Sequence, residues 1–342
     1  MGSVAVTCDE CRAEYRLFRS CRNRSCPQCQ GEARAKWLES RRQEILPVPY
    51  VHVVFAAPPE LRVLARFSPE PLYDAVIRAA GQALIEIGRS ELDAQLGCQV
   101  HLQTWSQRMG WHLHAHCVMP CGGFSADGSR WVSFEPDDLS RKALGGRFHA
   151  LLHRFIRAAF ERGEFERLPE TISVEKLLAR VKVRPGRVYA KPPFGGVETL
   201  LEYLARYTYR VAITNERIDK YEEHQVTFRW RDYGQGSERP CVLDGQEFLR
   251  RFVLHVPPRG FVCIRSYGFM GNRNRKQNLE RARQLIGNTG TAQRAEGFRP
   301  RRRLCPSCSG RDERTLHVAP RPEVVPQFAL PLRPPPIQPL AA

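Results

Sequence analysis

Apolar and polar residues alternate along positions 51–266 in two rhythms, one typical of strands and one typical of helices. Period-two and short apolar runs predict strands at 51–55, 100–105, 111–119, 187–190, 209–214, 225–231 and 260–266. Apolar spacings of three and four predict helices at 71–92, 144–160, 172–181 and 197–207, whereas 248–256 fits either a helix or an extended segment. This mixture of elements indicates an α+β fold.

The two ends of the chain lack this periodicity. Residues 1–36 are rich in Cys and Arg, so a metal ion has to replace a hydrophobic core there. From Gly271 the chain is rich in Arg and Asn, and eight of its last 24 residues are proline, which predicts an extended or disordered tail. The segments expected from these changes are 1–42, a small module; 43–269, the periodic central domain; 270–318, a basic extension; and 319–342, the tail.

Charge is concentrated near both ends. The formal net charge is +17, and residues 12–42 carry nine Lys or Arg against three acids, while residues 270–303 carry ten against two. Such stretches are solvated basic faces or contacts for phosphates, and a chain this basic favours nucleic acid as its partner. Phe298 is the only aromatic residue of 270–303, so this stretch is expected to contact phosphates and not to stack on bases.

Twelve cysteines are present, and four of them form two CxxC pairs near the N-terminus. Cys8 and Cys11 are separated from Cys26 and Cys29 by fourteen residues, close to the spacing of four-thiolate zinc sites. A closed site of this kind is structural, because it leaves no position for water. Cys21 is a fifth candidate ligand. Cys305 and Cys308 form half of a site, which either finds partners elsewhere in the fold or binds nothing.

Three histidines alternate in the segment Trp111-His-Leu-His-Ala-His-Cys-Val-Met-Pro120. On a strand, His112, His114 and His116 point to one side. Histidines on a strand are often no more than polar surface, but neighbours on one face can also reach a single metal ion.

Two tyrosines, Tyr203 and Tyr207, lie four residues apart on the helix predicted at 197–207, so they share a face. They are either core residues or paired nucleophiles. A divalent ion on histidines, Mg²⁺ or Mn²⁺, would neutralise a phosphodiester and orient it for in-line attack. A tyrosine oxygen would then displace the 3′-oxygen and become a covalent 5′-phosphotyrosine.

Several motifs occur in an order that is familiar from one family. They are Ser20-Cys-Arg-Asn-Arg-Ser-Cys-Pro-Gln-Cys29, Leu102-Gln-Thr-Trp105, His112-Leu-His-Ala-His116 with Pro120-Cys-Gly-Gly123, Val188-Tyr-Ala-Lys-Pro-Pro-Phe194 and Tyr203-Leu-Ala-Arg-Tyr-Thr-Tyr-Arg-Val-Ala-Ile213. From about residue 6 to residue 310 the chain resembles the rolling-circle insertion-sequence transposases of the two-tyrosine class with a His-hydrophobic-His (HUH) motif, the insertion-sequence ninety-one type.

The resemblance implies an HUH-nuclease-like antiparallel sheet flanked by helices, with the histidines on a central strand and the tyrosines on a helix beside it. Carried over by position, His114 and His116 are the metal ligands and Tyr203 and Tyr207 are the nucleophiles. Gln103 and Glu202 are both candidates for the third ligand. The partner is single-stranded DNA of transposon ends and target.

Two departures from the family pattern change what the resemblance implies. The chain begins almost at the zinc-binding module, whereas relatives usually carry a further helical stretch before it, which points either to a late start codon or to a copy shortened at its N-terminus. Ser25 stands where relatives often have His, which gives Cys21 more weight as a ligand.

Two rival functions remain open from the sequence. One is a rolling-circle replication initiator, which uses the same chemistry, and the other is a zinc-dependent DNA-binding regulator without catalysis. The first residues carry no secretory signal, and no apolar run reaches the ~20 residues that span a bilayer. The expected location is therefore the bacterial cytoplasm, in association with the nucleoid and away from membranes. The sequence does not decide the oligomeric state.

Overall fold

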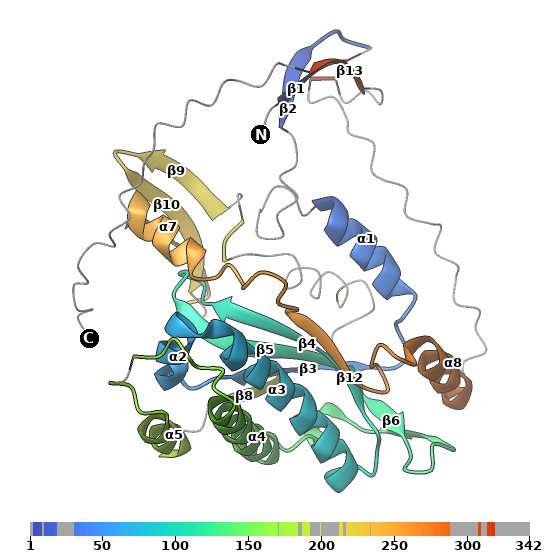
Figure 1. Ribbon diagram of the computed structural model, residues 1–342. Coiled ribbons are helices and arrows are strands. Elements are labelled where there is room, and N and C mark those ends of the chain that lie inside the picture. Colours follow the sequence, from blue (N-terminus) through green and yellow to red (C-terminus); the bar gives the residue numbers. More distant parts are fainter. Residues whose placement is uncertain are drawn as a thin grey trace. The chain divides into compact units, whose positions relative to one another are not determined.

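The computed structural model describes residues 3–8, 10–18, 31–169, 171–183, 187–191, 199, 212–214, 217–232, 234–287, 307–308 and 313–318 (Figure 1). The chain divides into two compact units. The large unit spans Asn23–Phe298, and the small unit combines Met1–Arg22 with Arg299–Ala342. No β-sheet of the described residues is shared between the two units.

A five-stranded antiparallel sheet forms the centre of the large unit. Its order is β12 (Ile264–Gly268), β4 (Gly97–Trp105), β5 (Trp111–Pro120), β3 (Tyr50–Ala56) and β8 (Val188–Lys191). β4 and β5 form a hairpin, whose turn is closed by a hydrogen bond from the Gly110 amide to Ser106 Oγ. β5 is thus the middle strand, which has neighbours on both sides.

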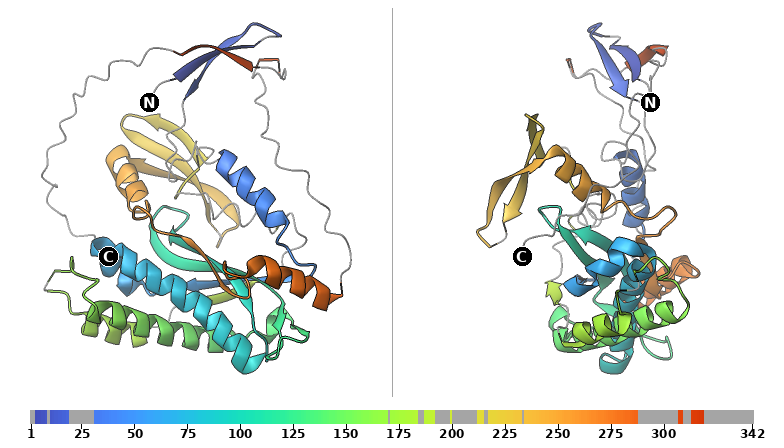
Figure 2. Two further views of the ribbon diagram at one scale, coloured as in Figure 1. Left: turned by 45° about the vertical axis from the view of Figure 1, so that its right-hand side comes forward. Right: turned by 60° about the vertical axis from the view of Figure 1, so that its left-hand side comes forward.

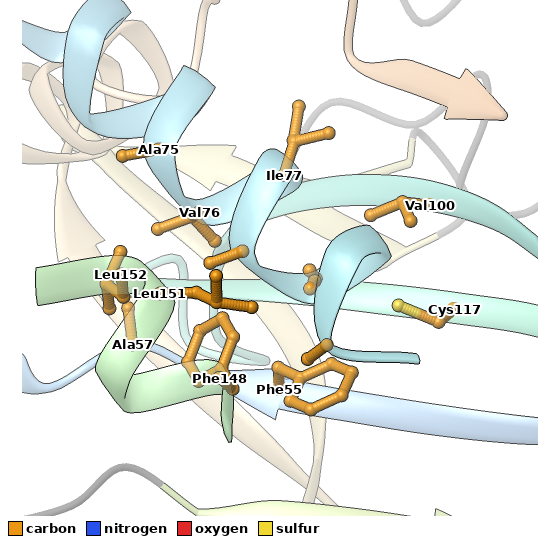
Figure 3. Close-up of a cluster of buried hydrophobic side chains, with 14 of the residues drawn as sticks. Phe55, Ala57, Ala75, Val76, Ile77, Val100, Cys117, Phe148, Leu151 and Leu152 are labelled. Atoms are coloured by element: carbon orange, nitrogen blue, oxygen red, sulfur yellow. The ribbon is translucent and has the colours of Figure 1, made fainter. Parts of the chain in front are cut away.

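Two long helices cover one face of this sheet. α3 (Pro69–Glu91) and α4 (Arg141–Glu161) lie side by side in the two views of Figure 2, and α5 (Val174–Val183) packs beside α4. The apolar positions of the strands point toward them: Phe55 meets Phe148 of α4 with ring centroids 4.8 Å apart, and Val100 and Cys117 lie under α3 (Figure 3). Because side chains alternate along a strand, the opposite face receives the polar positions.

The remaining elements of the large unit surround this core. They are α1 (Gly31–Arg42), η1 (Pro59–Leu61), α2 (Arg62–Phe67), β6 (Gly122–Phe124), β7 (Trp131–Ser133), η2 (Pro136–Asp138) and α8 (Arg275–Ile286). A second antiparallel sheet has the order β11 (Ser237–Asp244), β10 (Gln225–Asp232), β9 (Ile218–Glu222), and α7 (Gly245–Val253) packs on it through Phe248.

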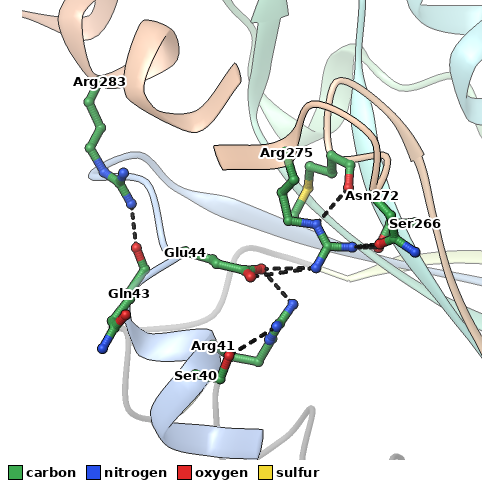
Figure 4. Close-up of polar contacts among 9 residues, drawn as sticks. Ser40, Arg41, Gln43, Glu44, Ser266, Asn272, Arg275 and Arg283 are labelled. Atoms are coloured by element: carbon green, nitrogen blue, oxygen red, sulfur yellow. Dashed lines mark hydrogen bonds and ion pairs between the residues drawn. The ribbon is translucent and has the colours of Figure 1, made fainter. Parts of the chain in front are cut away.

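Polar contacts join α8 to the end of α1. Arg275 lies 3.4 Å from Glu44, which also pairs with Arg41 at 2.6 Å, and Arg275 donates to Ser266 Oγ (Figure 4). Arg283 donates to the carbonyl oxygen of Gln43. Leu279 and Ala282 of α8 are buried beside Phe269. The first half of the predicted basic extension therefore packs as part of the large unit, whereas the boundaries expected at 270 and 318 stay predictions.

The small unit contains a three-stranded sheet in the order β13 (Glu313–Val318), β1 (Ser3–Cys8), β2 (Glu14–Phe18). β1 pairs with β2 as a hairpin and with β13 from the other end of the chain, both antiparallel. No helix among the described residues of either unit is long and apolar enough to cross a membrane.

The predicted α+β class, an antiparallel sheet flanked by helices, is confirmed. The strand predicted at 209–214 is wrong in its described part, 212–214, where Ala212 has a φ of +41° that interrupts an extended backbone. The helix predicted at 197–207 lies outside the described residues, apart from residue 199. α1 and α8 were not predicted. α1 has little apolar periodicity, whereas α8 lies in a stretch interpreted only as a basic extension, although Leu279, Ala282 and Ile286 follow the helical spacing.

Candidate active site

The middle strand β5 presents its histidines on the face that α3 and α4 leave uncovered. Leu113, Ala115 and Cys117 are buried in the core under the helices, so the alternating positions His112, His114 and His116 point the other way. The ring centroids of His112 and His114 are 4.6 Å apart, as are those of His114 and His116. The three histidines therefore point to one side of the strand, as the alternation predicted, and their role as metal ligands stays a prediction.

His114 is held in one tautomer. Its Nδ1 lies 2.8 Å from the carbonyl oxygen of His112, and since a carbonyl only accepts, Nδ1 carries the hydrogen and donates it. Burial, together with the neighbouring His112, lowers the pKa of His114 to about 3. The imidazole is therefore neutral near pH 7, and Nε2 keeps the lone pair that a metal ion requires.

His116 is oriented by a second histidine on the adjacent strand. Its Nδ1 lies 2.9 Å from Nε2 of His52 in β3, and the two rings stack with centroids 5.1 Å apart and planes 8° from parallel. Both side chains are buried. When His116 supplies the hydrogen of this bond, its own Nε2 becomes the metal-binding nitrogen, as in His114.

His101 extends the polar face to β4. It stands directly opposite His116 in the sheet, and the ring of Trp37 from α1 meets it edge-on at a centroid distance of 6.3 Å. Burial and the positive charge of Arg41 lower the pKa of His101 to about 4. His101 and His114 are therefore both neutral near pH 7 and do not repel a cation.

Gln103 lies opposite His114, one alternate position further along β4. Its amide nitrogen donates to the Trp105 carbonyl at 3.1 Å, which leaves the amide oxygen as the acceptor. That oxygen, Oε1, is buried and has no hydrogen-bond partner among the residues that the structure describes. A buried acceptor without a donor is unfavourable, and a cation beside His114 would satisfy it.

Tyr189 lies on the same face, near the sheet edge. It is paired with Val54 in β3, which in turn is paired with His116. Its side chain is 48% exposed. Tyr189 is thus a tyrosine close to the histidines that the motif pattern does not assign a role.

The site predicted from the sequence is therefore only partly visible. The structure brings together His114, His116 and the candidate third ligand Gln103. Tyr203, Tyr207 and Glu202 lie outside the described residues, as do Cys21, Cys26 and Cys29. His52 and His101 were missed, although each interrupts an apolar run between two directly adjacent residues that face the core.

One cysteine cluster lies in the small unit. Cys8 and Cys11 are joined there by Cys308, and their three sulfurs lie within 4.8 Å of one another. The predicted ligand set of Cys8, Cys11, Cys26 and Cys29 stays a prediction, because two of its members are not described.

Comparisons with known proteins show the family to which the chain belongs. A family described as "Putative transposase" matches residues 97–278, which contain β4, β5 and α4, and a family described as "Transposase zinc-binding domain" matches residues 1–57. The chain is 38% identical over 330 residues to "Putative transposase y4qJ" of Sinorhizobium fredii, and this match covers 90% of this chain and 83% of that relative. It is 24% identical over 291 residues to "Transposase for insertion sequence element IS801" of Pseudomonas savastanoi pv. phaseolicola, and this match covers 84% of this chain and 70% of that relative.

Among solved structures, the conjugative relaxase TrwC in complex with oriT DNA matches with 15% sequence identity and a TM-score of 0.26, over 46% of this chain and 71% of that one. The family matches define a transposase. The chain belongs to the insertion-sequence transposases of the ninety-one type, as its motifs predicted.

Proposed function

We propose that this transposase nicks and transfers single-stranded DNA through 5′-phosphotyrosine intermediates. Tyr203 and Tyr207 are the nucleophiles, and His114, His116 and Gln103 hold a divalent ion, Mg²⁺ or Mn²⁺. The observation that carries the proposal is the pair of donors on neighbouring strands: His114 with its Nε2 free of the proton, and the buried Gln103 oxygen opposite it.

The protein residues fit such an ion by charge and by type. Neutral imidazole favours transition ions and the amide oxygen suits Mg²⁺ and Mn²⁺, so a mixed donor set accepts Mn²⁺ well. The ion, when bound, neutralises charge on the scissile phosphate. His112 and His52 keep His114 and His116 in fixed orientations, which spares the site the cost of ordering them on binding.

The proposed cleavage exchanges one ester for another. The phenol oxygen of a tyrosine forms a bond to phosphorus, the bond from phosphorus to the 3′-oxygen breaks, and that oxygen leaves as a hydroxyl with a proton. The reverse attack, by a 3′-hydroxyl on the phosphotyrosine, restores a phosphodiester without a nucleotide cofactor. A second tyrosine on the same helix face allows a second cut while the first strand is still attached.

Formation of a covalent adduct tests this scheme. The purified chain is incubated with Mn²⁺ and an end-labelled single-stranded oligonucleotide from the element's own end, and adducts are separated in denaturant. Tyr203→Phe and Tyr207→Phe should each retain some adduct, and the double variant should form none. A double variant that forms adduct at the wild-type level would overturn the assignment.

Two control variants distinguish the proposed nucleophiles and metal ligands from neighbouring residues of the same type. Tyr189→Phe removes a hydroxyl from the same face of the sheet and should leave the adduct unchanged. His112→Ala removes an imidazole but keeps the carbonyl that orients His114, so it should bind Mn²⁺ nearly as well as wild type, whereas His114→Ala and His116→Ala should lose it.

The adduct assay, together with a test of mobilisation in cells, addresses the rival functions. A regulator without catalysis would bind the oligonucleotide and form no adduct with any variant. A replication initiator would form the adduct, yet fail to mobilise a marked element in cells.

A further inference from the structure

The two ends of the chain share one sheet in the small unit. β1 near the N-terminus pairs with β13 near the C-terminus, with Val4 opposite Val318 and Cys8 opposite Glu313. Cys8 is the last residue of β1, and Cys308 lies five positions before the start of β13. Strand pairing therefore brings cysteines 300 residues apart to the same end of the sheet.

The turn after β1 brings Cys11 to the same place. The Cys8 amide donates to the Ala13 carbonyl at 3.0 Å, and the Arg12 amide donates to the Cys8 carbonyl at 2.9 Å. Arg12 has a φ of +61°, in the left-handed region that reverses the chain direction tightly. A turn closed in this way keeps the two sulfurs of a CxxC pair on one side.

The distances between the sulfurs fit a metal ion. Cys8 Sγ and Cys308 Sγ are 3.7 Å apart, and Cys11 Sγ lies within 4.8 Å of both. A tetrahedral zinc ion with bonds of about 2.3 Å separates its sulfur ligands by about 3.8 Å, whereas a disulfide needs about 2.05 Å. Cys8 is buried, while Cys11 and Cys308 are exposed, so an ion here would lie at the border of the small unit.

We propose that Cys8, Cys11 and Cys308 hold a structural zinc ion that fastens the C-terminal segment to the N-terminal module. Sequence spacing points to the fourth ligand, because Cys305-Pro-Ser-Cys308 repeats the CxxC spacing of Cys8 and Cys11. The proposed set shares Cys8 and Cys11 with the zinc site predicted from the sequence and takes Cys305 and Cys308 as its other two ligands, whereas Cys26 and Cys29 lie outside the described residues. It also reaches beyond residues 1–57, which the zinc-binding family model matches.

Four thiolates leave no position for water, so the ion stabilises the fold and does not take part in DNA cleavage. Closing the site ties residues 3–18 to residues 307–318. The proposed zinc site is independent of the nuclease chemistry, since none of these cysteines belongs to the histidine site.

Metal content of the purified full-length protein tests the ligand set. Cys8→Ser and Cys308→Ser should each lose one equivalent of zinc, and the double variant should lose no more than either single variant, because both residues hold the same ion. Cys308→His should keep the zinc, since imidazole is also a zinc ligand. Cys263→Ser, which removes a half-buried thiol of the large unit, is the control and should change nothing.

Thiol protection gives a second measurement that does not depend on folding of a variant. Cys11 and Cys308 are exposed, so in wild-type protein a bound ion should shield them from alkylation, and a chelator should make them reactive. Wild-type zinc content in Cys308→Ser, a double variant that loses two equivalents, or a Cys8–Cys308 disulfide in place of the ion would each overturn the proposal. The adduct assay reports on the tyrosines separately.

Discussion

A buried histidine binds a metal ion only when its hydrogen sits on the nitrogen that faces away from the ion. At the residue scale, the contacts that fix this hydrogen are therefore as important for metal binding as the ligands themselves. The His112 carbonyl fixes the tautomer of His114, because a carbonyl oxygen only accepts and Nδ1 of His114 must therefore carry the hydrogen. For His116 the partner is another imidazole, His52, so its tautomer depends on which ring holds the hydrogen.

His52→Phe should therefore weaken metal binding without removing a ligand. Phenylalanine keeps the ring that stacks on His116 but offers no acceptor for Nδ1–H. Loss of such an orienting partner typically reduces metal affinity by about 10–100-fold. Calorimetric titration with Mn²⁺ measures the effect, with His112→Ala as the comparison. An unchanged Mn²⁺ affinity in His52→Phe would mean that packing alone orients His116.

His255 should make stability depend on pH. It is 3% exposed, its Nε2 donates to the Met109 carbonyl at 3.0 Å, and its Nδ1 accepts from Thr104 Oγ1 at 3.1 Å. Burial lowers its pKa below the ordinary value of 6.5, against the opposing effect of the Met109 hydrogen bond. His255 therefore binds a proton more readily in the unfolded chain than in the folded protein. The stability that its neutral ring provides is complete above pH 6.5 and is lost as the pH falls below that value.

The comparison of wild type with His255→Gln isolates this group from the other buried histidines. The difference in their free energies of unfolding, measured by urea titration from about pH 7.5 to about pH 5, should shrink as the pH falls. A difference that stays constant across that range would show that His255 does not titrate on unfolding.

At the scale of elements, the alternation of apolar and polar residues predicted those helices and strands that bury one face in the core. The strands at 51–55, 100–105 and 111–119 and the helix at 71–92 each have one face in the core, so burial imposes a period that is visible in the sequence. α1 has few apolar residues and no clear period, so alternation could not predict it. α8 does carry a helical period, in Leu279, Ala282 and Ile286, but the abundance of Arg and Asn around it led to its interpretation as a basic extension.

Close approach of two elements also depends on single glycines. Gly81 of α3 faces the ring of Tyr267 on β12, and a β-carbon at Gly81 would meet three atoms of that ring closely enough to force it aside. Gly146 of α4 has no atom within 4 Å of the position of its missing β-carbon among the described residues. The two positions are therefore a matched pair with opposite expected effects.

Gly81→Ala should destabilise the protein by about 1–3 kcal/mol, as other overpacked cores do. Gly146→Ala should stabilise it by about 0.5–1 kcal/mol, because alanine is the better helix former and meets nothing. Urea unfolding at a single pH measures both changes. Equal stability of Gly81→Ala and wild type would show that the helix and strand move apart without cost.

At the scale of the whole molecule, the sequence predicted some of the residues that lie close together but not all of their neighbours. The CxxC spacing predicted that Cys8 and Cys11 lie together, but the proximity of Cys308 to Cys8 depends on the pairing of β1 with β13, which no local pattern encodes. The histidine face was predicted from one strand, whereas His52 and His101 join it only through the strand order of the sheet. Long-range contacts of this kind required the structure.

Arginines near the C-terminal end of the chain divide into two groups with different expected roles. Arg275, Arg281 and Arg283 of α8 donate to Ser266, to the Gly128 carbonyl and to the Gln43 carbonyl, so they contribute to folding of the large unit. Arg301, Arg302 and Arg303 lie outside the described residues, in the basic stretch whose only aromatic residue is Phe298. The second group is the one expected to contact DNA phosphates.

Neutralising Arg301, Arg302 and Arg303 together should weaken DNA binding about equally for all sequences, because phosphates carry no base identity. The logarithmic dependence of affinity on salt should also flatten, by roughly one unit of slope for each phosphate that the protein no longer neutralises. Binding to two unrelated single-stranded oligonucleotides, measured by fluorescence anisotropy from about 50 to about 200 mM salt, provides both readouts. Arg281→Ala is the control: removing its bond to Gly128 should lower the urea midpoint and leave the salt slope unchanged. A triple variant that loses affinity for only one oligonucleotide would assign these arginines to base recognition, and the salt dependence would then have to arise elsewhere on the chain.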